Sequence, residues 1–256
     1  MNVTQCYLLI QLRLLLLTID MLLHSNSILQ LMKQQIDELL AQDQQLQIFL
    51  TWVSRKSRTV PAKKRPVTLR AFYFDLAFAR ALTPVGGTLD LARAFNNTIT
   101  CNLETTLALD LALDRTLALD VIIDRILDPQ LVFERVLERA VAHACVVDPN
   151  LERSLQQLKE QLPDLGKDKE KFKQWWKTNG GAWSDRLRSV IIEHRHLGYD
   201  WQFSARQKDA LKQYYDANQL LVNCLNSDRY STTTVREEIE NTLLLPIAEI
   251  SLHIPH

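Results

Sequence analysis

Hydrophobic positions along most of the chain recur three or four residues apart, which is the spacing of one face of an α-helix. The pattern is clearest from Ser27 to Trp52, where we predict one amphipathic helix, and it recurs over 131–147. Only six glycines interrupt segments rich in the good helix formers Leu, Ala, Gln, Glu, Lys and Arg. The sequence therefore predicts an all-α fold, with an irregular array of helices over 1–150 followed by a compact helical domain over 151–256.

Short capping motifs predict where several of these helices begin. Asp-Pro pairs at 128–129 and 148–149 each supply a capping Asp and a Pro at the first helical position. Ser204 and Gln207 form a capping box, so we expect a helix to start just after Phe203. We expect the buried side of this helix to hold Leu211, Tyr214, Tyr215, Leu221 and Leu225.

The chain has one internal repeat, the tetrapeptide LALD. It occurs at 107–110, 111–114 and 117–120. Alternation over 107–114 would also fit a strand, but Ala and Asp are poor strand formers, so we predict a helix. On a helix the carboxylates share one stripe, made of Asp110, Asp114, Asp120, Asp124 and Asp128. We expect this stripe to be solvated or paired with arginines such as Arg115 and Arg125, because its spacing lacks the bent, glycine-containing loop of calcium sites.

Residues 55–70 carry seven basic side chains and no acidic one, and Pro61 and Pro66 interrupt any helix there. This composition predicts an extended basic linker over 55–68. Such a linker can bind phosphates of a nucleic acid, and the candidate contacts are Arg55, Lys56, Arg58, Lys63, Lys64 and Arg65. It lacks the interleaved aromatic residues that stack on bases, which argues against this use. The alternative is that the linker docks on the acidic stripe of the same chain.

Composition limits the class of partner. Of 256 residues 46% are hydrophobic, enough to bury a core, and 30 basic side chains balance 30 acidic ones. A chain without net charge has no general attraction to nucleic acid or membrane.

The chain divides into four predicted segments: N-terminal helices over 1–54, the basic linker over 55–68, a Leu/Ala/Asp-rich helical region over 69–150 and a C-terminal helical domain over 151–256.

The N-terminal segment 6–23 has about the length of a membrane span, but Arg13 and Asp20 within it are costly in hydrocarbon. We therefore expect a helix packed in protein and a cytoplasmic location. The four cysteines form no C-x-x-C pair, which argues against zinc ribbons and favours buried thiols.

Motifs that carry catalysis or bind cofactors are missing from the sequence. It contains no phosphate-binding P-loop, no G-x-S-x-G elbow and no H-x-x-x-H metal motif. A thiol hydrolase built from Cys224 and either His194 or His196 is conceivable. However, Cys224 lies at the Leu221/Leu225 end of the apolar repeat of its helix, which favours a buried thiol. We expect no enzyme activity, no cofactor and no metal.

Aromatic residues concentrate after residue 171. Four of the five tryptophans lie there, joined by Phe172, Tyr199 and Phe203. Such residues usually form core, but they also anchor protein interfaces. The candidates for an interaction surface are Trp175, Trp176, Trp183, Trp201 and Tyr214. Gly198 breaks the chain between the helix that carries His194 and His196 and the helix that begins after Phe203. We expect Trp201 and Phe203 to close over the corner between these two helices.

From about Leu158 onward the sequence resembles the C-terminal helical domain of bacterial, especially cyanobacterial, NACHT-type signalling NTPases, which are STAND proteins of conflict and immunity systems. The matching pieces are WWKTNG at 175–180, YDWQFS at 199–204, QKDALKQYYDANQLLVNCLNS at 207–227 and REEIENTLLLPIAEI at 236–250. Residues 31–53, 70–82 and the LALD repeat also resemble the region that precedes this domain.

The resemblance implies a sensor or regulatory module that acts through protein contacts and has no active-site residues. In that family the NTPase drives ligand-triggered oligomerisation, and helical C-terminal regions sense the trigger or hold the protein inactive. The family's P-loop module should lie upstream, so we expect this chain to be the C-terminal part of such a protein, from a truncated or split gene. Its expected partners are the NTPase module and a protein trigger; residues 1–24 match no part of the family.

Overall fold

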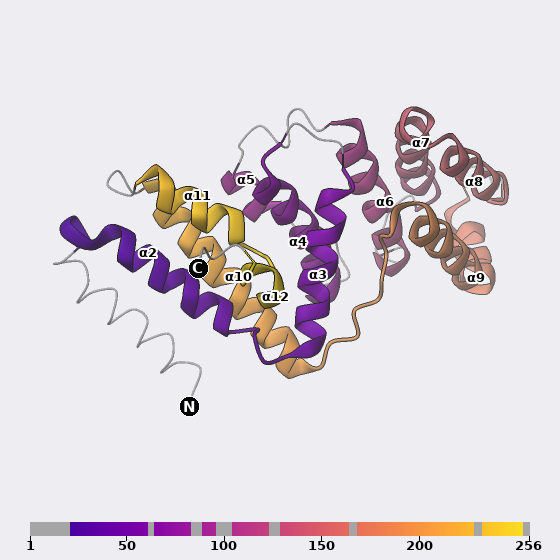
Figure 1. Ribbon diagram of the computed structural model, residues 1–256. Coiled ribbons are helices and arrows are strands. Elements are labelled where there is room, and N and C mark those ends of the chain that lie inside the picture. The colour runs from indigo at the N-terminus through magenta and orange to yellow at the C-terminus, as the bar shows by residue number, and fades with distance from the viewer. Residues whose placement is uncertain are drawn as a thin grey trace.

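The computed structural model describes residues 21–60, 64–82, 89–95, 104–122, 129–163, 168–227 and 232–252. Within these ranges the chain forms eleven helices and no strand (Figure 1). In chain order they are α2 (Met21–Glu38), α3 (Gln44–Arg58), α4 (Pro66–Leu82), α5 (Asp90–Phe95), α6 (Thr105–Ile122), α7 (Pro129–Val147), α8 (Pro149–Glu160), α9 (Lys169–Arg195), α10 (Ala205–Ser227), α11 (Thr233–Thr242) and α12 (Ile247–Ile250). The all-α prediction is confirmed, and the described residues contain none of the parallel sheet on which a P-loop NTPase domain is built.

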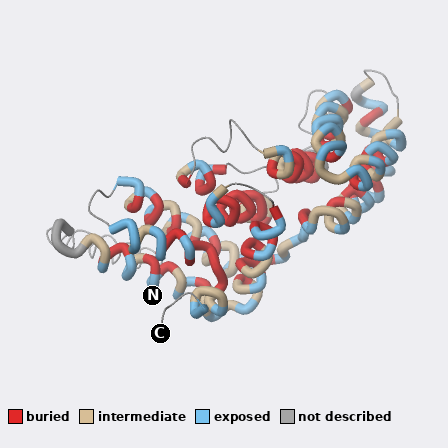
Figure 2. The backbone as a smooth tube through the Cα atoms, turned by 45° about the horizontal axis from the view of Figure 1, so that its top comes forward, coloured by how far each residue is buried: buried red, intermediate tan, exposed pale blue. Residues whose placement is uncertain are grey.

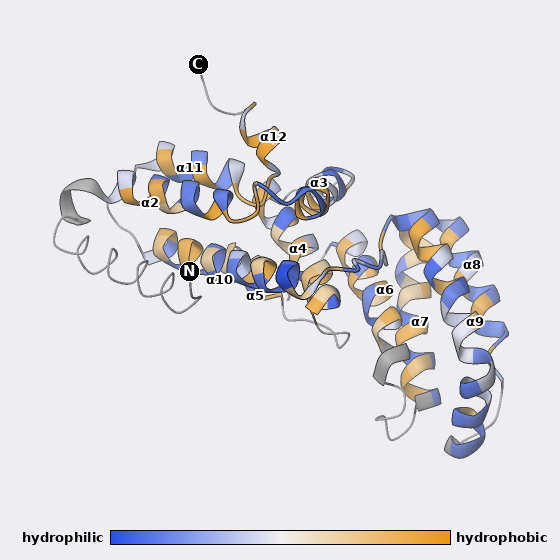
Figure 3. Cartoon of the chain, turned by 90° about the horizontal axis from the view of Figure 1, so that it is seen from below, coloured by the Kyte–Doolittle hydropathy of each residue, from blue (hydrophilic) through white to orange (hydrophobic). Residues whose placement is uncertain are grey.

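The helices pack in two groups (Figure 3). The larger group consists of α2, α3, α4, α5, α10, α11 and α12, and the smaller group consists of α6, α7, α8 and α9. α12 joins the larger group through α3, where the backbone N–H of Ile247 donates to Gln47 Oε1 at 2.9 Å. The chain crosses between the groups twice, once between α5 and α6 and once between α9 and α10.

Each group contains one helix that is buried on nearly all sides (Figure 2). In α4 every residue from Val67 to Ala77 is buried. In α6 the LALD repeat places Leu or Ala on every face, and the buried residues include Leu107, Leu109 and Leu113. A helix that is apolar all round belongs in a core, because it has no face suited to water. Buried apolar residues form one cluster that continues through both groups.

The predicted helix starts are confirmed. α7 begins at Pro129, and Asp128 before it lies outside the described residues. α8 begins at Pro149, and Asp148 Oδ1 accepts hydrogen bonds from the N–H of Asn150 at 3.0 Å and of Leu151 at 3.1 Å.

The capping box at the start of α10 is also confirmed. The N–H of Ser204 donates to Gln207 Oε1 at 3.0 Å, and the N–H of Gln207 donates to Ser204 Oγ at 3.3 Å. Both bonds satisfy amide groups that the first turn of a helix otherwise leaves unpaired.

The single helix predicted from Ser27 to Trp52 is wrong, because the structure has two helices there. α2 ends at Glu38, and α3 begins after Asp43, whose Oδ1 accepts from the N–H of Leu46 at 3.1 Å. Leu40 between them is fully buried, so apolar residues continue at nearly helical spacing through the break.

The prediction of an extended linker over 55–68 is also wrong at both ends. α3 continues to Arg58, and α4 begins at Pro66. Pro suits the first turn of a helix because no hydrogen bond is required of its nitrogen there. Residues 61–63 lie outside the described residues.

Helix packing crosses position 150, where the sequence suggests a new domain. α8 and α9 pack with α6 and α7 in the smaller group, whereas α10 and α11 pack with α2, α4 and α5 in the larger one. The C-terminal segment 151–256 therefore contributes helices to both groups. The division into four segments remains a prediction.

Candidate functional site: a buried ionic junction between the helix groups

The side chain of Asp110, in α6, is fully buried and binds three polar side chains. Arg195 of α9 donates two hydrogen bonds to it, from Nε to Oδ1 at 2.8 Å and from Nη2 to Oδ2 at 3.0 Å. Tyr73 of α4 donates its hydroxyl to Oδ2 at 2.6 Å, and Lys56 Nζ of α3 lies 3.3 Å from the same oxygen. One carboxylate thus joins four helices.

These contacts connect the two groups, because Asp110 and Arg195 belong to the smaller group whereas Lys56 and Tyr73 belong to the larger one. One helical turn further along α6, Asp114 forms an ion pair with Arg80 of α4. Arg80 Nη2 also donates to the backbone carbonyl of Asp114 at 3.3 Å. The spacing of four residues in the LALD repeat places both carboxylates on one face of the helix. We call the resulting cluster the ionic junction; it consists of Lys56, Tyr73, Arg80, Asp110, Asp114 and Arg195.

Burial shifts the pKa values of several side chains in the ionic junction. It lowers the pKa of Lys56, and the charge of Asp110 opposes this effect. It raises the pKa of Tyr73 well above its usual value, an effect that neighbouring Asp110 reinforces. For Arg195 burial acts to lower the pKa, but the hydrogen bonds and charge of Asp110 outweigh it and the pKa is raised. Tyr73 therefore stays a neutral hydrogen-bond donor and Arg195 stays a cation at physiological pH.

Asp114 responds to the same balance of burial and pairing. Burial raises its pKa, and the charge and hydrogen bond of Arg80 oppose the rise. Its carboxylate therefore depends on Arg80 to remain ionised.

The chain segment between α9 and α10 packs against the ionic junction. Trp52 of α3 donates its indole N–H to the carbonyl of His196 at 3.1 Å. His196 and Gly198 have left-handed backbone conformations, with φ of 51° and 83°. Glycine suits position 198 because of its left-handed backbone, and a Cβ there would also lie only 3.0 Å from Leu117 Cδ1 of α6.

Trp201 and Phe203, which we expected to close over the corner between α9 and α10, pack on α3. Their rings lie 5.2 Å and 5.7 Å from the ring of Phe49 in α3, and both contacts are edge-on.

The aromatic residues predicted as one cluster lie in two. In the smaller group Trp175, Trp176 and Trp183 pack with Phe133 and Phe172. The larger group holds Trp201 with Phe49, and Tyr214 with Phe74. The described ring contacts do not connect the two clusters.

Exposure separates the five candidates for an interaction surface. Trp176, Trp183 and Tyr214 are buried and belong to the core. Trp183 also donates its indole N–H to the carbonyl of Leu158 at 3.0 Å. Trp175 and Trp201 are half-buried and keep part of their rings accessible.

Several of the candidate basic contacts bind acidic residues of the same chain. Lys56 is buried in the ionic junction, Arg58 pairs with Glu249 of α12, and Arg65 pairs with Glu240 of α11. Arg55 is exposed, Lys64 is half-buried, and Lys63 lies outside the described residues. Lys56 with Asp110 is an instance of the predicted docking of the basic segment on the acidic stripe.

The partners of the acidic stripe differ from the expected ones. Asp110 binds Arg195 and Lys56, and Asp114 binds Arg80, whereas we expected Arg115 and Arg125. Arg115 is exposed, and Arg125 lies outside the described residues. Asp124, Asp128 and the side chain of Asp120 lie outside them as well.

Sequence reasoning missed buried Arg70, which fixes the end of α11 on α4. Its Nε donates to the carbonyl of Leu243 at 2.7 Å, and its Nη2 donates to those of Glu240 at 2.7 Å and Asn241 at 3.0 Å. Burial lowers the pKa of Arg70 to about 10. Carbonyl acceptors belong to the backbone, so no residue type in the sequence indicates this contact.

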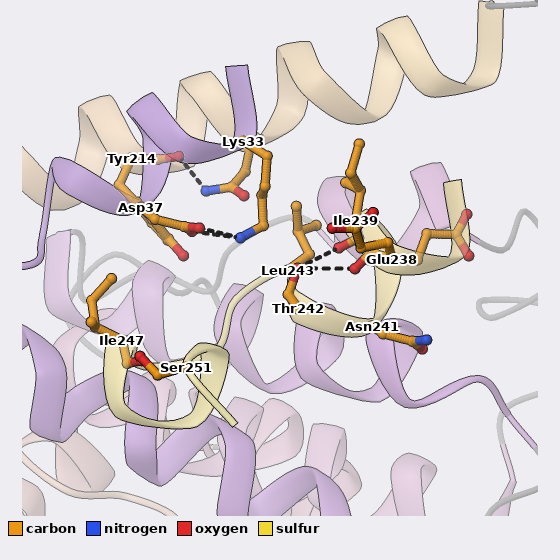
Figure 4. A network of polar contacts seen from close by, with 12 residues as sticks. Lys33, Asp37, Tyr214, Glu238, Ile239, Asn241, Thr242, Leu243, Ile247 and Ser251 are labelled. Atoms are coloured by element: carbon orange, nitrogen blue, oxygen red, sulfur yellow. Dashed lines mark hydrogen bonds and ion pairs between the residues drawn. The ribbon is translucent and has the colours of Figure 1, made fainter. Parts of the chain in front are cut away.

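A second, partly buried polar pair lies on the side of α2 that faces α10 and α11 (Figure 4). Lys33 Nζ donates to Asp37 Oδ1 at 2.6 Å within α2, near Tyr214 of α10. Burial lowers the pKa of Lys33 and raises that of Asp37, and each partner opposes the shift of the other.

The thiol and the histidines considered for hydrolysis are not assembled into a site. His194 Nδ1 lies 3.0 Å from Asp148 Oδ2 in the smaller group, and His196 lies by Trp52. Cys224 lies near the C-terminal end of α10, half-buried against the core. At 1.5 Å per residue, α10 places it about 28 Å from Ala205 at the other end of that helix.

Metal binding and membrane insertion would each need a specific arrangement of the described residues. No group of three or more His, Cys, Asp or Glu side chains among them is placed to hold a metal ion. In the same part of the chain, no helix combines the length and apolar character needed to cross a membrane.

Part of the chain matches a known protein family. Residues 151–246 match the NACHT C-terminal Helical domain 2. No curated protein and no solved structure matches the chain. The match covers less than half of the sequence and includes most of α8 and all of α9, α10 and α11, so it takes helices from both groups. Residues 151–246 are therefore similar to a NACHT-associated helical domain, and their helices pack in the structure against those of residues 21–147.

Proposed function

We propose that this chain is the non-catalytic sensor or regulatory region of a NACHT-type signalling NTPase of a defence or conflict system, and that it acts through protein–protein contacts. The observation that carries the proposal is the match of residues 151–246 to the NACHT C-terminal Helical domain 2. The NTPase module that it would regulate belongs either to the same polypeptide or to a second one.

The arrangement of charged side chains supports a regulatory role over a catalytic one. The ionic junction is buried, and its acidic, basic and phenolic groups bind one another. Such a cluster fixes the position of helices but offers no accessible nucleophile or base to a substrate.

Two half-buried tryptophans are the best-placed candidates for a protein contact. Trp175 lies on α9 in the smaller group, and Trp201 packs on Phe49 of α3 in the larger group. Partly exposed tryptophans contribute strongly to interfaces when a partner buries them. We propose these two residues as contact sites for the NTPase module or the protein trigger.

The alternative, nucleic-acid binding through the basic segment, has less support. Lys56, Arg58 and Arg65 are engaged by acidic side chains of the chain itself. Lys56 is buried and cannot reach a phosphate, and Arg58 and Arg65 would have to exchange Glu249 and Glu240 for phosphate partners. Binding to DNA or RNA with a steep dependence on salt would favour the alternative.

The test is reconstitution with an NTPase-bearing NACHT chain encoded in the same genome. We expect co-purification on size exclusion and a change in the rate of ATP or GTP hydrolysis when the chain is added. Trp175→Ala should weaken the complex, whereas Lys177→Ala, an exposed change two residues away, should leave it intact. Absence of both a complex and an effect on hydrolysis would refute the proposal.

A further inference from the structure

We propose that the ionic junction is an orientation latch: the two helix groups rotate against one another as rigid bodies, and Asp110 and Asp114 hold them in the orientation seen here. This inference concerns motion within the chain and does not depend on the proposed NTPase partner.

The contact between the groups is narrow. Among the described helices, α7, α8 and α9 pack chiefly with each other and with α6, and the main contact that crosses between the groups is that of α6 with α4. A rotation of α6–α9 as one body therefore has to remodel the contacts of α6 with α4 and α3 and the two chain connections between the groups, one of which is segment 196–204. Rotations about a small interface, with exchange of its salt bridges, are a common form of conformational switching.

The polar bonds across this contact define the orientation. Tyr73 and Lys56 bind Asp110, and Arg80 binds Asp114, each pair joining one group to the other. The apolar cluster continues around these bonds and constrains the angle less, because dispersion and hydrophobic contacts are not directional. Buried ion pairs typically add little net stability, because their desolvation cost offsets the attraction, but they can specify register.

Asp110 has a feature that suits a latch. Its two hydrogen bonds to Arg195 lie within the smaller group, so they persist when the groups rotate. The carboxylate therefore remains paired after Tyr73 and Lys56 withdraw. Without Arg195, rotation would leave an unpaired buried charge, which is costly.

The segment between α9 and α10 has the backbone of a hinge. His196 is a non-glycine residue at φ 51°, and Gly198 at φ 83° packs on Leu117 of α6. A few loop or helix-terminal residues of this kind absorb the backbone change of a rigid-body motion. The hinge thus lies directly beside the latch.

The test measures one distance between the groups by electron paramagnetic resonance of two spin labels. One label is attached to exposed Cys145 on α7 and the other to a cysteine introduced at exposed Lys212 on α10, after Cys6, Cys101 and Cys224 are replaced by Ala. The substitutions compared in this background are Arg80→Glu, Asp114→Arg and the two together. Circular dichroism checks that each variant keeps its helix content.

The matched control is Lys159→Glu. It changes the charge by the same amount as Arg80→Glu, but it disrupts an ion pair with Glu138 that joins α8 and α7 within the smaller group. We expect this variant to keep the distance distribution of the parent chain.

We expect the parent chain to give one narrow distance, each single charge reversal to shift most of the population to a different or broader distribution, and the double reversal to restore the narrow one. Unchanged distributions in both folded single variants would overturn the proposal. Failure of the folded double variant to restore the parent distance would do so too. If Arg80→Glu does not fold, the milder Arg80→Gln is measured instead, and loss of helix in that variant as well would show that the pair belongs to the folding core and would also overturn the proposal.

Discussion

Two adjacent glycines of α9 offer a matched pair of substitutions, for which we expect changes of opposite sign in the free energy of unfolding. Gly180 is buried and Gly181 is exposed, and both lie inside the 27-residue helix. Replacing a helical glycine by Ala favours folding by about 0.8–1 kcal/mol, because Ala has the higher helix propensity and less freedom to lose. The space around the added methyl group decides whether that gain is kept.

At Gly180 an added Cβ would lie 2.6 Å from Cε2 and 2.7 Å from Cδ2 of the Trp176 ring. Trp176 is buried among Phe133, Phe172 and Trp183, so its ring cannot yield without moving theirs. Overpacking of this kind costs about 1–3 kcal/mol, so Gly180→Ala should be destabilising by up to about 2 kcal/mol after the propensity gain.

At Gly181 an added Cβ meets no atom within 4 Å outside its own helix and chain neighbours. Gly181→Ala should therefore keep the full gain of about 0.8–1 kcal/mol. Urea unfolding of both variants, followed by circular dichroism and tryptophan fluorescence, measures the two changes in free energy. An equal stabilisation by both substitutions would refute the packing of Trp176 over Gly180.

Three further substitutions test other parts of the structure. Trp201→Ala removes a half-buried indole that packs on Phe49, and should lower the free energy of unfolding by about 2–3 kcal/mol, less than at a fully buried site; a loss below about 1 kcal/mol would contradict that packing. Asp148→Ala removes the N-cap of α8 and should cost about 1 kcal/mol at neutral pH. Partial burial acts against ionisation of Asp148, but amide hydrogen bonds and His194 outweigh it and lower its pKa. The cap thus contributes above the unfolded pKa and is lost as pH falls through the folded one, so the difference between parent and variant should shrink as the pH is lowered below about 4, and a constant difference would refute the cap. Burial raises the pKa of Asp75 well above its usual value. Its stabilising contribution is thus complete below about pH 4 and is lost as pH rises through the folded pKa, so unfolding curves at several pH values should show the parent losing stability relative to Asp75→Asn; a pH-independent difference would contradict the burial.

Features encoded within a few neighbouring residues could be predicted from the sequence. The caps at Asp148 and Ser204 depend on side chains and amides no more than three residues apart. The helical state of the LALD repeat follows from the preference of Leu and Ala for helix. These local terms stay the same whatever the rest of the chain does.

Long-range partners could not be predicted, because no periodic pattern encodes them. The bond of Arg195 to Asp110 joins residues 85 apart, and that of Arg70 to the carbonyl of Leu243 joins residues 173 apart. The spacing of the aspartates and the clustering of basic residues over 55–70 indicated an acidic stripe and a basic segment. Neither pattern could show which charges pair. The LALD repeat places Leu or Ala on every face of α6, which indicates a buried helix. Aspartates on a buried helix need partners, and this was the clue that the sequence offered.

At the break between α2 and α3, the apolar periodicity of the sequence hid the helix-capping signal of Asp43. Ile36, Leu40 and Leu46 continue the apolar pattern through it, and all three are buried on the same core. Periodicity therefore suggested a continuous helix. Asp43, whose carboxylate caps α3, was the residue that marked the new start.

The central claim is that the buried carboxylate of Asp110 joins the two helix groups, and a double-mutant cycle with Tyr73 tests it most directly. Tyr73→Phe, Asp110→Asn and the double variant are compared with the parent chain by urea unfolding. A hydrogen bond from Tyr73 to the buried carboxylate that Arg195 also binds predicts a coupling energy of about 1.5–3 kcal/mol. Effects that add within about 0.5 kcal/mol would contradict the claim.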